Sequence, residues 1–423
     1  MNLKKKTAKL TLSLKSEFLS ESTINMSLAN GRSILAIPGP SVIPERVLNA
    51  MHQPAPNIYV GSLLDTVDGL VPDLKKVART DGYVAMYIGN GHAAWEASLA
   101  NTLAQGDRVL VAATGRFGLS WAELARRRGL DVEVIDFGNR NVVDNKALEN
   151  VLNDDKNKLI KALLVVQVDT ATSAKTDILS IRNSLNNCNH PALLMIDSIA
   201  CLGCDPMEMD AWGVDVMVAG CQKGLMVPPG MSFVFFNDKA QEYRKKLKIV
   251  SSYWDWEPRN NPNNFYEYFC GTAPTHHLFG LREALNMIIN EEGLEAVWKR
   301  HEVLARAIWA ACDKWGSEGP LELNIKESSN RSHAVTAIRV SPPSGTKLRD
   351  WLTENTGVTL GIGIMTDRDD PAWHGFFRIG HMGHVNAHMV LGTLGAIDAG
   401  LKAVGIPHGK GAQEAASLIC ANG

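Results

Sequence analysis

Residues 215–230 read Asp215-Val-Met-Val-Ala-Gly-Cys-Gln-Lys223-Gly-Leu-Met-Val-Pro-Pro-Gly230, which places one lysine in a Gly/Pro turn directly after an apolar strand. A second apolar run, Met231-Ser-Phe-Val-Phe-Phe236, follows the turn. Burial between two such strands lowers the pKa of a lysine and makes its amine a usable nucleophile and base. The structural alternative is a strand-end lysine that extends its ammonium group into solvent. This segment alone does not separate the two interpretations.

A carboxylate ends the preceding apolar strand, Pro191-Ala-Leu-Leu-Met-Ile-Asp197. Ligands of parallel α/β sheets bind beyond the carboxyl ends of the strands, so we expect Asp197 and Lys223 to meet at one site. Pyridoxal 5′-phosphate is a cofactor that would engage both residues, because a lysine binds its aldehyde and an aspartate pairs with its pyridinium nitrogen. A single aspartate after a strand is more often a helix cap or a turn residue, so the prediction rests on the pair.

A candidate phosphate site follows another expected strand, in Gly82-Tyr-Val-Ala-Met-Tyr-Ile-Gly89-Asn90-Gly91-His92. A glycine turn that opens a helix presents free backbone N–H groups and a positive dipole end to an anion. Two glycines between a strand and a helix also serve packing, so the motif is weak by itself. Its position before the Asp197 and Lys223 strands favours the cofactor interpretation.

Further motifs extend along the chain: Ile37-Pro-Gly-Pro-Ser-Val-Ile-Pro44, Asn90-Gly-His92, Asp169-Thr-Ala-Thr172-Ser, Asp197-Ser-Ile-Ala, Gln222-Lys223 and Phe376-Phe-Arg378-Ile-Gly-His-Met-Gly383. With them the sequence resembles the class V branch of the fold-type I pyridoxal-phosphate aminotransferases. Within that branch it is most similar to the serine–glyoxylate and alanine–glyoxylate aminotransferases. The run around Gln222-Lys223 before Pro-Pro-Gly is the most specific element of the resemblance.

The resemblance implies the roles of three residues that carry the chemistry. Lys223 would form the Schiff base with the cofactor, and Asp197 would keep the pyridine nitrogen protonated. Arg378 would bind the substrate carboxylate through a two-pronged hydrogen bond, for which a planar guanidinium is suited. An unpaired arginine in an apolar strand would be costly, so Arg378 requires either a structural or an incoming carboxylate.

The resemblance also implies a set of cofactor-binding residues and a subunit arrangement. Phe117 would stack on the cofactor ring and Thr172 would lie near its phenolic oxygen, although ordinary core and turn roles remain alternatives. Thr272 would reach the phosphate from the neighbouring subunit, so a homodimer with shared active sites is implied, and a homotetramer stays open. The residues expected around the phosphate are Asn90, Gly91, His92 and Gln222.

Two positions depart from the family pattern. Phe269 stands where the glyoxylate aminotransferases often carry a tyrosine that binds the phosphate, so that contact is lost or is supplied by Tyr268 or Tyr266. The segment Pro56-Asn-Ile-Tyr-Val-Gly-Ser62 replaces a run that is common near the substrate entrance. The identity of the amino donor is therefore open.

The resemblance implies an enzyme that transaminates L-serine or L-alanine with a small 2-oxo acid, glyoxylate favoured, through a pyridoxamine-phosphate form. A pyridoxamine–pyruvate aminotransferase is the alternative, but the further arginine expected for it is absent from Val358–Met365. A cysteine desulfurase would need a reactive cysteine between Cys312 and Cys420, where there is none. A protein that only binds the cofactor would not require Arg378.

Alternating strands and amphipathic helices between about residues 80 and 240 predict an α/β fold. We expect a mostly parallel, seven-stranded sheet covered by helices. A helix over 280–292 then leads to a smaller C-terminal α+β domain with strands in 332–340 and 376–380 and a closing helix over 386–403. The expected divisions are an N-terminal extension (1–35), a large cofactor-binding domain (36–290) and a small domain (291–423). The seven expected strands are Val84–Ile88, Val109–Ala112, Val132–Ile135, Ala162–Gln167, Ala192–Ile196, Val216–Ala219 and Ser232–Phe236.

The composition indicates a globular chain with a large core, because 423 residues are 45% hydrophobic and 21% charged. A formal net charge of −2 gives no electrostatic case for nucleic acid or an anionic membrane surface. The seven scattered cysteines favour a reducing compartment, the cytoplasm, and neither a secretory signal nor a membrane span is expected. No set of ligands has recognisable zinc spacing, so no metal is expected.

Overall fold

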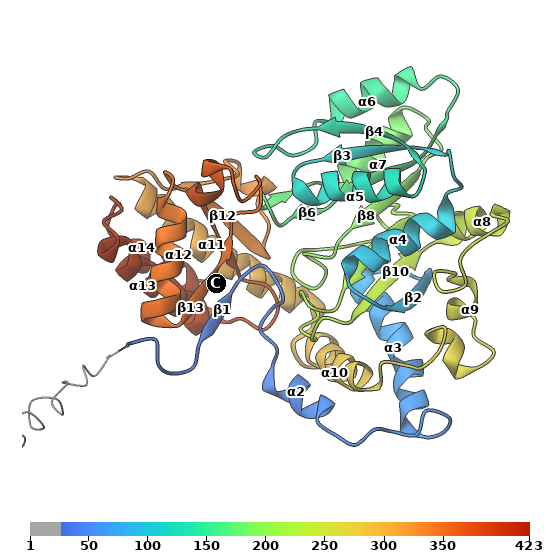
Figure 1. Ribbon diagram of the computed structural model, residues 1–423, viewed down its shortest axis with the longest axis horizontal. Coiled ribbons are helices and arrows are strands. Elements are labelled where there is room, and N and C mark those ends of the chain that lie inside the picture. Colours follow the sequence, from blue (N-terminus) through green and yellow to red (C-terminus); the bar gives the residue numbers. More distant parts are fainter. Residues whose placement is uncertain (1–26) are drawn as a thin grey trace, which may run out of the picture.

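The computed structural model describes residues 27–423, which form two lobes (Figure 1). The larger lobe is built on a seven-stranded sheet of order β2-β10-β9-β8-β5-β3-β4. Neighbouring strands are parallel except β10, which runs antiparallel to both β2 and β9. These strands are β2 (Tyr83–Ile88), β3 (Arg108–Ala113), β4 (Asp131–Asp136), β5 (Ile160–Val166), β8 (Leu193–Asp197), β9 (Val216–Gly220) and β10 (Met231–Phe236).

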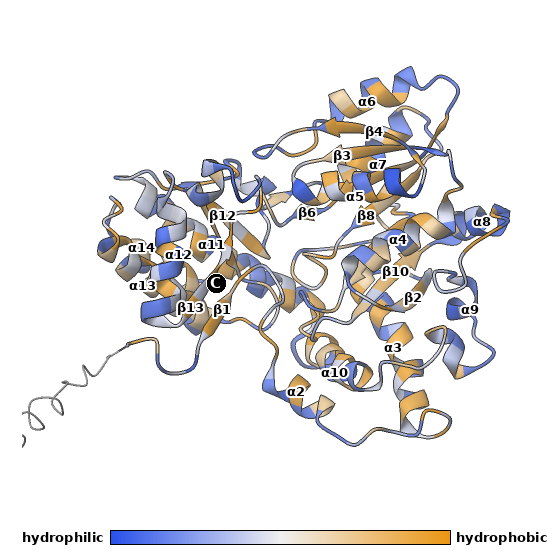
Figure 2. Cartoon of the chain, viewed as in Figure 1, coloured by the Kyte–Doolittle hydropathy of each residue, from blue (hydrophilic) through white to orange (hydrophobic). Residues whose placement is uncertain are grey.

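Apolar side chains on both faces of this sheet explain why its central strands read as continuous hydrophobic runs. Along β2, Val84 and Met86 enter one core cluster, whereas Ala85 and Tyr87 enter the other. The orange strands of Figure 2 show this apolar interior. The predicted α/β fold with a mostly parallel seven-stranded sheet is confirmed.

Helices cover the large sheet, and several of them, such as those over 91–102 and 116–127, begin soon after a strand ends. Four begin with a side-chain cap: Asn90 before α4, Asp144 before α6, Asp177 before α7 and Asn237 before α8. The helices of this lobe are α2 (Glu45–Met51), α3 (Ser62–Ala78), α4 (Gly91–Thr102), α5 (Arg116–Arg127), α6 (Asn145–Asp154), α7 (Ile178–Asn187), α8 (Asp238–Lys246), α9 (Glu257–Asn260), η1 (Phe265–Tyr268), α10 (Thr275–Leu285) and the π-helix η2 (Asn286–Glu292). A short hairpin, β6 (Val168–Asp169) with β7 (Ala174–Lys175), follows β5.

A five-stranded sheet of order β1-β13-β14-β12-β11 forms the second lobe with four helices (Figure 1). Its first strand comes from the N-terminal part of the chain, because β1 pairs in parallel with β13. The strands are β1 (Ile34–Ala36), β11 (Glu322–Leu323), β12 (Val335–Arg339), β13 (Val358–Ile362) and β14 (Phe376–Gly380). The helices are α11 (Leu294–Gly316), α12 (Ser344–Thr356), α13 (Ala387–Ala403) and α14 (Ala412–Ala421), joined by short η3 (Ser328–Asn330) and η4 (Pro371–Gly375).

Three expectations for the C-terminal half are corrected. The helix expected over 280–292 begins earlier and changes from α10 to the π-helix η2 at Asn286. The strand expected from Ser332 is limited to Val335–Arg339, because Ser332 is engaged in contacts with another loop. The helix ending at Ala403 does not close the chain: a Gly- and Pro-containing stretch stops it, and α14 then packs against α11.

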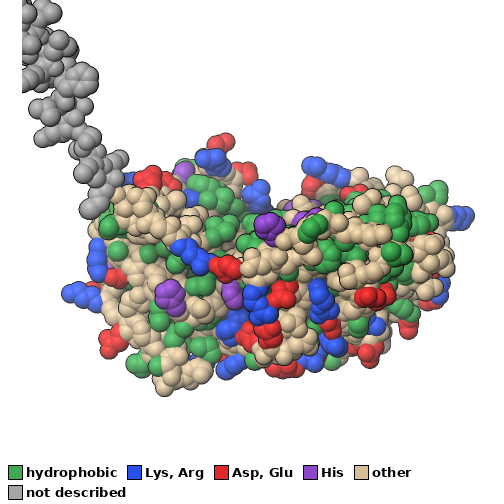
Figure 3. Space-filling view, turned by 90° about the horizontal axis from the view of Figure 1, so that it is seen from below, with side chains coloured by type: hydrophobic (Ala, Val, Ile, Leu, Met, Phe, Trp, Pro, Cys, Tyr) green, Lys and Arg blue, Asp and Glu red, His purple; other side chains and the backbone are tan. Residues whose placement is uncertain are grey.

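The predicted boundaries at 35 and 290 stay a prediction, and most of the expected N-terminal extension lies outside the described residues. The surface carries charges of both signs without a single dominant patch in the view of Figure 3, in keeping with the small net charge. Among the helices of residues 27–423, none combines the length and apolar character needed to cross a bilayer.

Candidate active site

The predicted site residues gather at one edge of the large sheet. Asp197 ends β8, Lys223 follows β9, Phe117 follows β3 and Asn90 follows β2. Because β2, β3, β5, β8 and β9 all point their carboxyl ends in the same direction, the loops that follow them share one edge. The topology therefore brings together residues that are more than a hundred positions apart.

Lys223 lies under the N-terminal loop that follows β1. Its Nζ donates a hydrogen bond to the carbonyl oxygen of Pro38 at 2.6 Å. Gly39 makes this approach possible, because a Cβ at that position would overlap the lysine side chain. Burial lowers the pKa of Lys223 to about 8; the nearby Arg378 guanidinium lowers it as well, and the Asp197 carboxylate opposes both. A neutral amine is thus available close to neutral pH.

Asp197 is buried and held by two donors. Its Oδ1 accepts from the backbone N–H of Ile199 at 2.7 Å, and its Oδ2 accepts from the indole N–H of Trp95 at 2.9 Å. Burial raises the pKa of this carboxyl to about 7, the two N–H donors lower it, and the neighbouring Asp169 raises it. A cationic partner would restore the ionised form fully.

A second buried carboxylate, Asp169, organises the loop after β3. Its Oδ2 accepts from the backbone N–H of Phe117 at 2.7 Å and of Gly118 at 3.3 Å. Burial raises the pKa of Asp169, while these backbone N–H groups and Arg378 lower it. Thr172, also buried, donates its hydroxyl to the Thr114 carbonyl at 3.1 Å. Phe117 is therefore fixed by the Asp169 carboxylate, and Thr172 is fixed by the backbone carbonyls of Thr114 and Asp169.

Arg378 reaches this edge from β14 in the other lobe. Its Nε donates to the Ile362 carbonyl and one terminal nitrogen donates to the Thr170 carbonyl, both at 2.7 Å. The residue is only 6% exposed, and burial lowers its pKa to about 10. Within residues 27–423, no carboxylate lies within 4 Å of its guanidinium. Its charge is thus held by carbonyl oxygens and lacks an ionic partner among the described residues.

The amino end of α4 lies beside these groups. Asn90 caps the helix by accepting from the His92 backbone N–H at 3.1 Å, so this N–H is already paired. Gly91 packs so tightly on Ile199 that a Cβ would overlap it. The exposed His92 ring contacts Trp95 and lines a cavity of about 770 Å³ that also includes Arg116 and Thr366. Neither Lys223 nor Asp197 lines that cavity, so it is a neighbouring space and not the lysine site.

Comparison with known proteins agrees with this geometry. The family model described as "Aminotransferase class-V" matches residues 89–371, a segment that contains Asp197 and Lys223. This chain is a class V aminotransferase. The predicted family, its enzymatic nature as a transaminase and its dependence on pyridoxal phosphate are confirmed.

Named relatives of this class V aminotransferase cover nearly its whole length. It is 34% identical to a serine–glyoxylate aminotransferase of Arabidopsis thaliana, over 89% of this chain and 92% of the relative. It is also 34% identical to a serine–glyoxylate aminotransferase of Methylorubrum extorquens, over 93% and 97%. Its fold is similar to the crystal structure of ureidoglycine–glyoxylate aminotransferase from Bacillus subtilis, with a TM-score of 0.82, 25% identity, and coverage of 92% and 98%.

The residues at the sheet edge of this aminotransferase fit the cofactor of its class. Buried polar atoms are nearly always paired in proteins, yet the Gln222 Oε1 and the Thr114 hydroxyl are buried without a hydrogen-bond partner among the residues that the structure describes. The Gln222 amide can present either its oxygen or its NH₂ group to a ligand after a half-turn. An unpaired amide directly before Lys223, and an unpaired hydroxyl that follows β3 at the same sheet edge, are groups that a polar ligand such as pyridoxal phosphate would satisfy.

The segment 266–272 contains the other residues considered for the phosphate contact, and their side chains differ in exposure. Phe269 is buried in the large core, and the Tyr268 hydroxyl lies 3.5 Å from Asp68. Tyr266 is 59% exposed, and Thr272 is also exposed. Of these four residues, Tyr266 and Thr272 have the side chains that face solvent in the single chain.

Three contributors to the site were not predicted from the sequence. Trp95 binds Asp197, Asp169 binds the backbone of the Phe117 loop, and Pro38 accepts from Lys223. A buried carboxylate after an apolar strand was a readable signal for Asp169, as it was for Asp197. The residues that Trp95 and Pro38 contact depend on the order of the strands in the sheet. A local sequence pattern does not predict that order.

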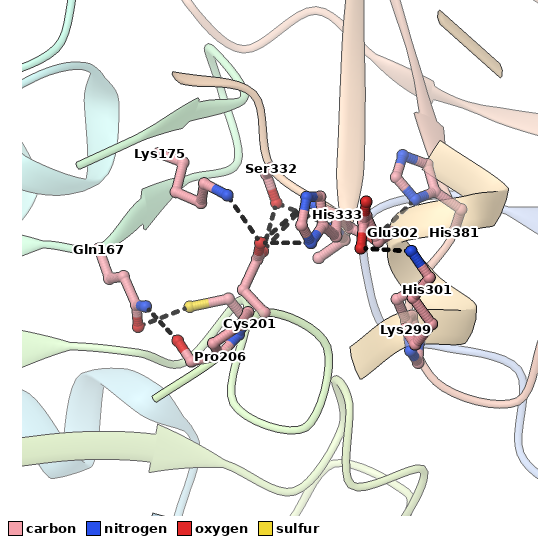
Figure 4. A network of polar contacts seen from close by, with 12 residues as sticks. Gln167, Lys175, Cys201, Pro206, Lys299, His301, Glu302, Ser332, His333 and His381 are labelled. Carbon is pink, nitrogen blue, oxygen red and sulfur yellow. Dashed lines mark hydrogen bonds and ion pairs between the residues drawn. The ribbon is translucent and has the colours of Figure 1, made fainter. Parts of the chain in front are cut away.

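A buried polar network joins the two lobes beside the site (Figure 4). At its centre Asp205, whose side chain is fully buried, accepts from the Ser332 hydroxyl at 3.0 Å and from the His333 backbone N–H at 3.1 Å. Lys175 of β7 approaches the same carboxylate at 3.5 Å. Ser332 and His333 directly precede β12, which pairs with the Arg378 strand β14. The network therefore fixes the Arg378 sheet against the cofactor lobe.

Replacement of Asp205 by alanine is expected to lower the free energy of unfolding by about 3 kcal/mol, because Lys175, Ser332 and His333 would lose a buried common partner. Urea unfolding measures this change. Glu242→Ala is the matched control: its ion pair with Lys245 lies within one helix, is exposed and should cost at most about 1 kcal/mol. Equal losses in the two variants would show that Asp205 does not join the lobes.

Proposed function

We propose that this aminotransferase moves the amino group of L-serine, or secondarily L-alanine, to a small 2-oxo acid, with glyoxylate as the favoured acceptor. The serine–glyoxylate relatives at 34% identity support this choice of donor and acceptor. The observation that carries the proposal is the meeting of Lys223, Asp197 and a buried Arg378 without an ionic partner at one edge of the sheet.

Each of the three residues has one task in the proposed reaction. Pyridoxal phosphate, when bound, supplies an aldehyde that accepts the amino group and a ring that draws electrons from the substrate Cα. Lys223 holds the cofactor and, once released by the donor, moves a proton from Cα. Asp197 supplies the negative charge that keeps the ring nitrogen protonated. Arg378 binds the carboxylate of donor and acceptor in turn.

The surrounding residues would hold and orient the cofactor. We assign the phosphate to the start of α4, where Asn90, Gly91 and His92 would surround it, and to the Gln222 amide. The unpaired state of Gln222 and the helix dipole of α4 support this assignment. Phe117 would lie against the ring and Thr172 near its phenolic oxygen, both positioned through Asp169 and its loop.

Arg378→Ala is expected to raise the KM for donor and acceptor alike by about 100-fold, since both substrates would lose the same charge-assisted contact. Arg378→Lys is the conservative control. The lysine keeps the positive charge but cannot form the two-pronged hydrogen bond of the guanidinium. The KM values of Arg378→Lys should therefore lie between those of the wild type and of Arg378→Ala. Steady-state kinetics with each substrate varied in turn measures the effect. Unchanged KM values in the alanine variant would place the carboxylate site elsewhere.

The visible absorption spectrum of the purified holoenzyme tests the donor directly. L-Serine added without any oxo acid should remove the absorption band of the lysine-bound cofactor and release hydroxypyruvate. A band that stays with L-serine and disappears with L-alanine would make alanine the donor. A band that neither amino acid changes would overturn the proposed donors, even with the family assignment intact.

We also propose a homodimer with shared active sites, in which Thr272 reaches the phosphate of the neighbouring subunit. The exposed position of Thr272 in the single chain supports this arrangement, and a tetramer of such dimers is compatible with it. Tyr266, exposed in the same segment, is our candidate for the phosphate contact that Phe269 cannot make. Sedimentation analysis of the holoenzyme would measure the assembly.

We propose the cytoplasm as its compartment, because all seven cysteines are free thiols and five of them are buried. We further propose the division of the chain into a cofactor-binding domain (36–290) and a small domain (291–423). The two separate sheets support this division.

A further inference from the structure

Trp95 contacts the cofactor-side carboxylate from within helix α4. Its indole N–H donates to Asp197 Oδ2 at 2.9 Å, and the two side chains are 1% and 4% exposed. The same helix begins at Gly91, so one rigid element carries both the proposed phosphate site and, one turn later, the donor to Asp197. No role for Trp95 follows from the transamination chemistry itself.

Aromatic neighbours fix the orientation of the Trp95 ring. Trp121 stacks on it with ring centroids 5.8 Å apart and planes at 12°, and Phe117 packs edge-on at 6.4 Å. His92 contacts the ring at 4.5 Å. Because these neighbours restrict the indole, its N–H is held toward Asp197, and the carboxylate is oriented by Trp95 on one oxygen and Ile199 on the other.

We propose that Trp95 is a positioning residue whose indole N–H keeps the Asp197 carboxylate in one orientation and in its anionic form, ready for the ring nitrogen of the cofactor. The inference rests on the proposed role of Asp197. A hydrogen bond to a carboxylate favours the charged form, and here it acts against strong desolvation. Without the indole donor, Asp197 would keep only the Ile199 N–H, and its pKa would rise above the present value of about 7.

Other ionisable groups act on Asp197 from the elements around it. Asp169 raises its pKa and Lys223 lowers it, while the buried Cys201 thiol lies near enough to feel its charge. His92 contacts the Trp95 ring. All of these groups remain when Trp95 is replaced, so a change confined to the Trp95 variant reports the indole bond.

The binding of pyridoxal phosphate to the apoprotein, followed by equilibrium dialysis across the neutral pH range, tests the proposal. Affinity should fall as pH drops through the pKa of Asp197. In Trp95→Phe that fall should occur about one pH unit higher, and binding at pH 7 should be about tenfold weaker. Trp298→Phe is the matched control, because the Trp298 indole nitrogen has no hydrogen-bond partner among the described residues and Trp298 packs in a different core cluster from Trp95. A Trp95→Phe profile that coincides with the wild-type profile, or an equal shift in Trp298→Phe, would overturn the proposal.

A second measurement does not depend on whether Trp95→Phe folds. The indole N–H resonance of Trp95 in the wild-type apoprotein should shift with pH at the midpoint of Asp197, and Asp197→Asn should remove that titration. An indole signal that is insensitive to pH would overturn the proposal. Neither measurement uses an amino acid or an oxo acid, so its failure is distinguishable from a wrong assignment of the transamination substrates.

Discussion

Lys223→Ala is expected to reduce transamination by at least about 10⁴-fold and to remove the absorption band of the lysine-bound cofactor. The variant loses both the amine that holds the cofactor and the base that moves the Cα proton. Loss of the Lys223 amine should not unfold the protein, because the only hydrogen bond that the Nζ makes among the described residues is to the Pro38 carbonyl. Single-turnover absorbance measurements with L-serine follow both effects.

Two controls separate chemistry from packing for Lys223. Lys239→Ala removes another lysine of the same lobe, which binds the Ala192 carbonyl and Asp215 at the amino ends of β8 and β9, and should keep the absorption band. A small primary amine added to Lys223→Ala should restore part of the turnover if the missing group is a base. Wild-type turnover and an unchanged band in Lys223→Ala would remove this lysine from the mechanism.

Asp197→Asn is expected to reduce turnover by about 10³-fold and to weaken cofactor binding, while the fold is retained. The amide has the same shape, but it carries no negative charge and cannot keep the ring nitrogen protonated. It can accept only one of the N–H groups of Ile199 and Trp95, so a loss of about 1 kcal/mol in unfolding free energy accompanies the change. Turnover and thermal unfolding are measured on the same preparation. Near-normal turnover would contradict the pyridinium role.

The sequence was sufficient for the strands of the large sheet and for the residues that end them. Strands buried on both faces are continuous apolar runs, so their ends are visible as the first polar residues, among them Asp197 and Asn90. A parallel sheet then brings such ends to one edge without any further information. The same reasoning applies to Lys223, which follows β9 by three residues.

Contacts between distant segments could not be predicted in this way. Trp95 and Asp197 are 102 positions apart, and Arg378 and Thr170 are 208 apart. Whether such residues meet depends on strand order and on how the lobes dock, and neither leaves a periodic signal in the chain. The change from α10 to the π-helix η2 was missed for another reason, since both helix types show similar amphipathic patterns over a few turns.

The hydrogen bond between Lys223 and Pro38 bears on the order in which a growing chain is completed. Pro38 follows β1, and β1 pairs with β13 near the opposite end of the polypeptide. The seven strands of the large sheet have all been synthesised by Phe236, and domains generally fold as units during translation. Strand β1, which is synthesised early, must therefore wait for β13 before it can pair, and this pairing is highly non-local. A nascent chain can contain every strand of its large sheet while its reactive amine is still uncovered.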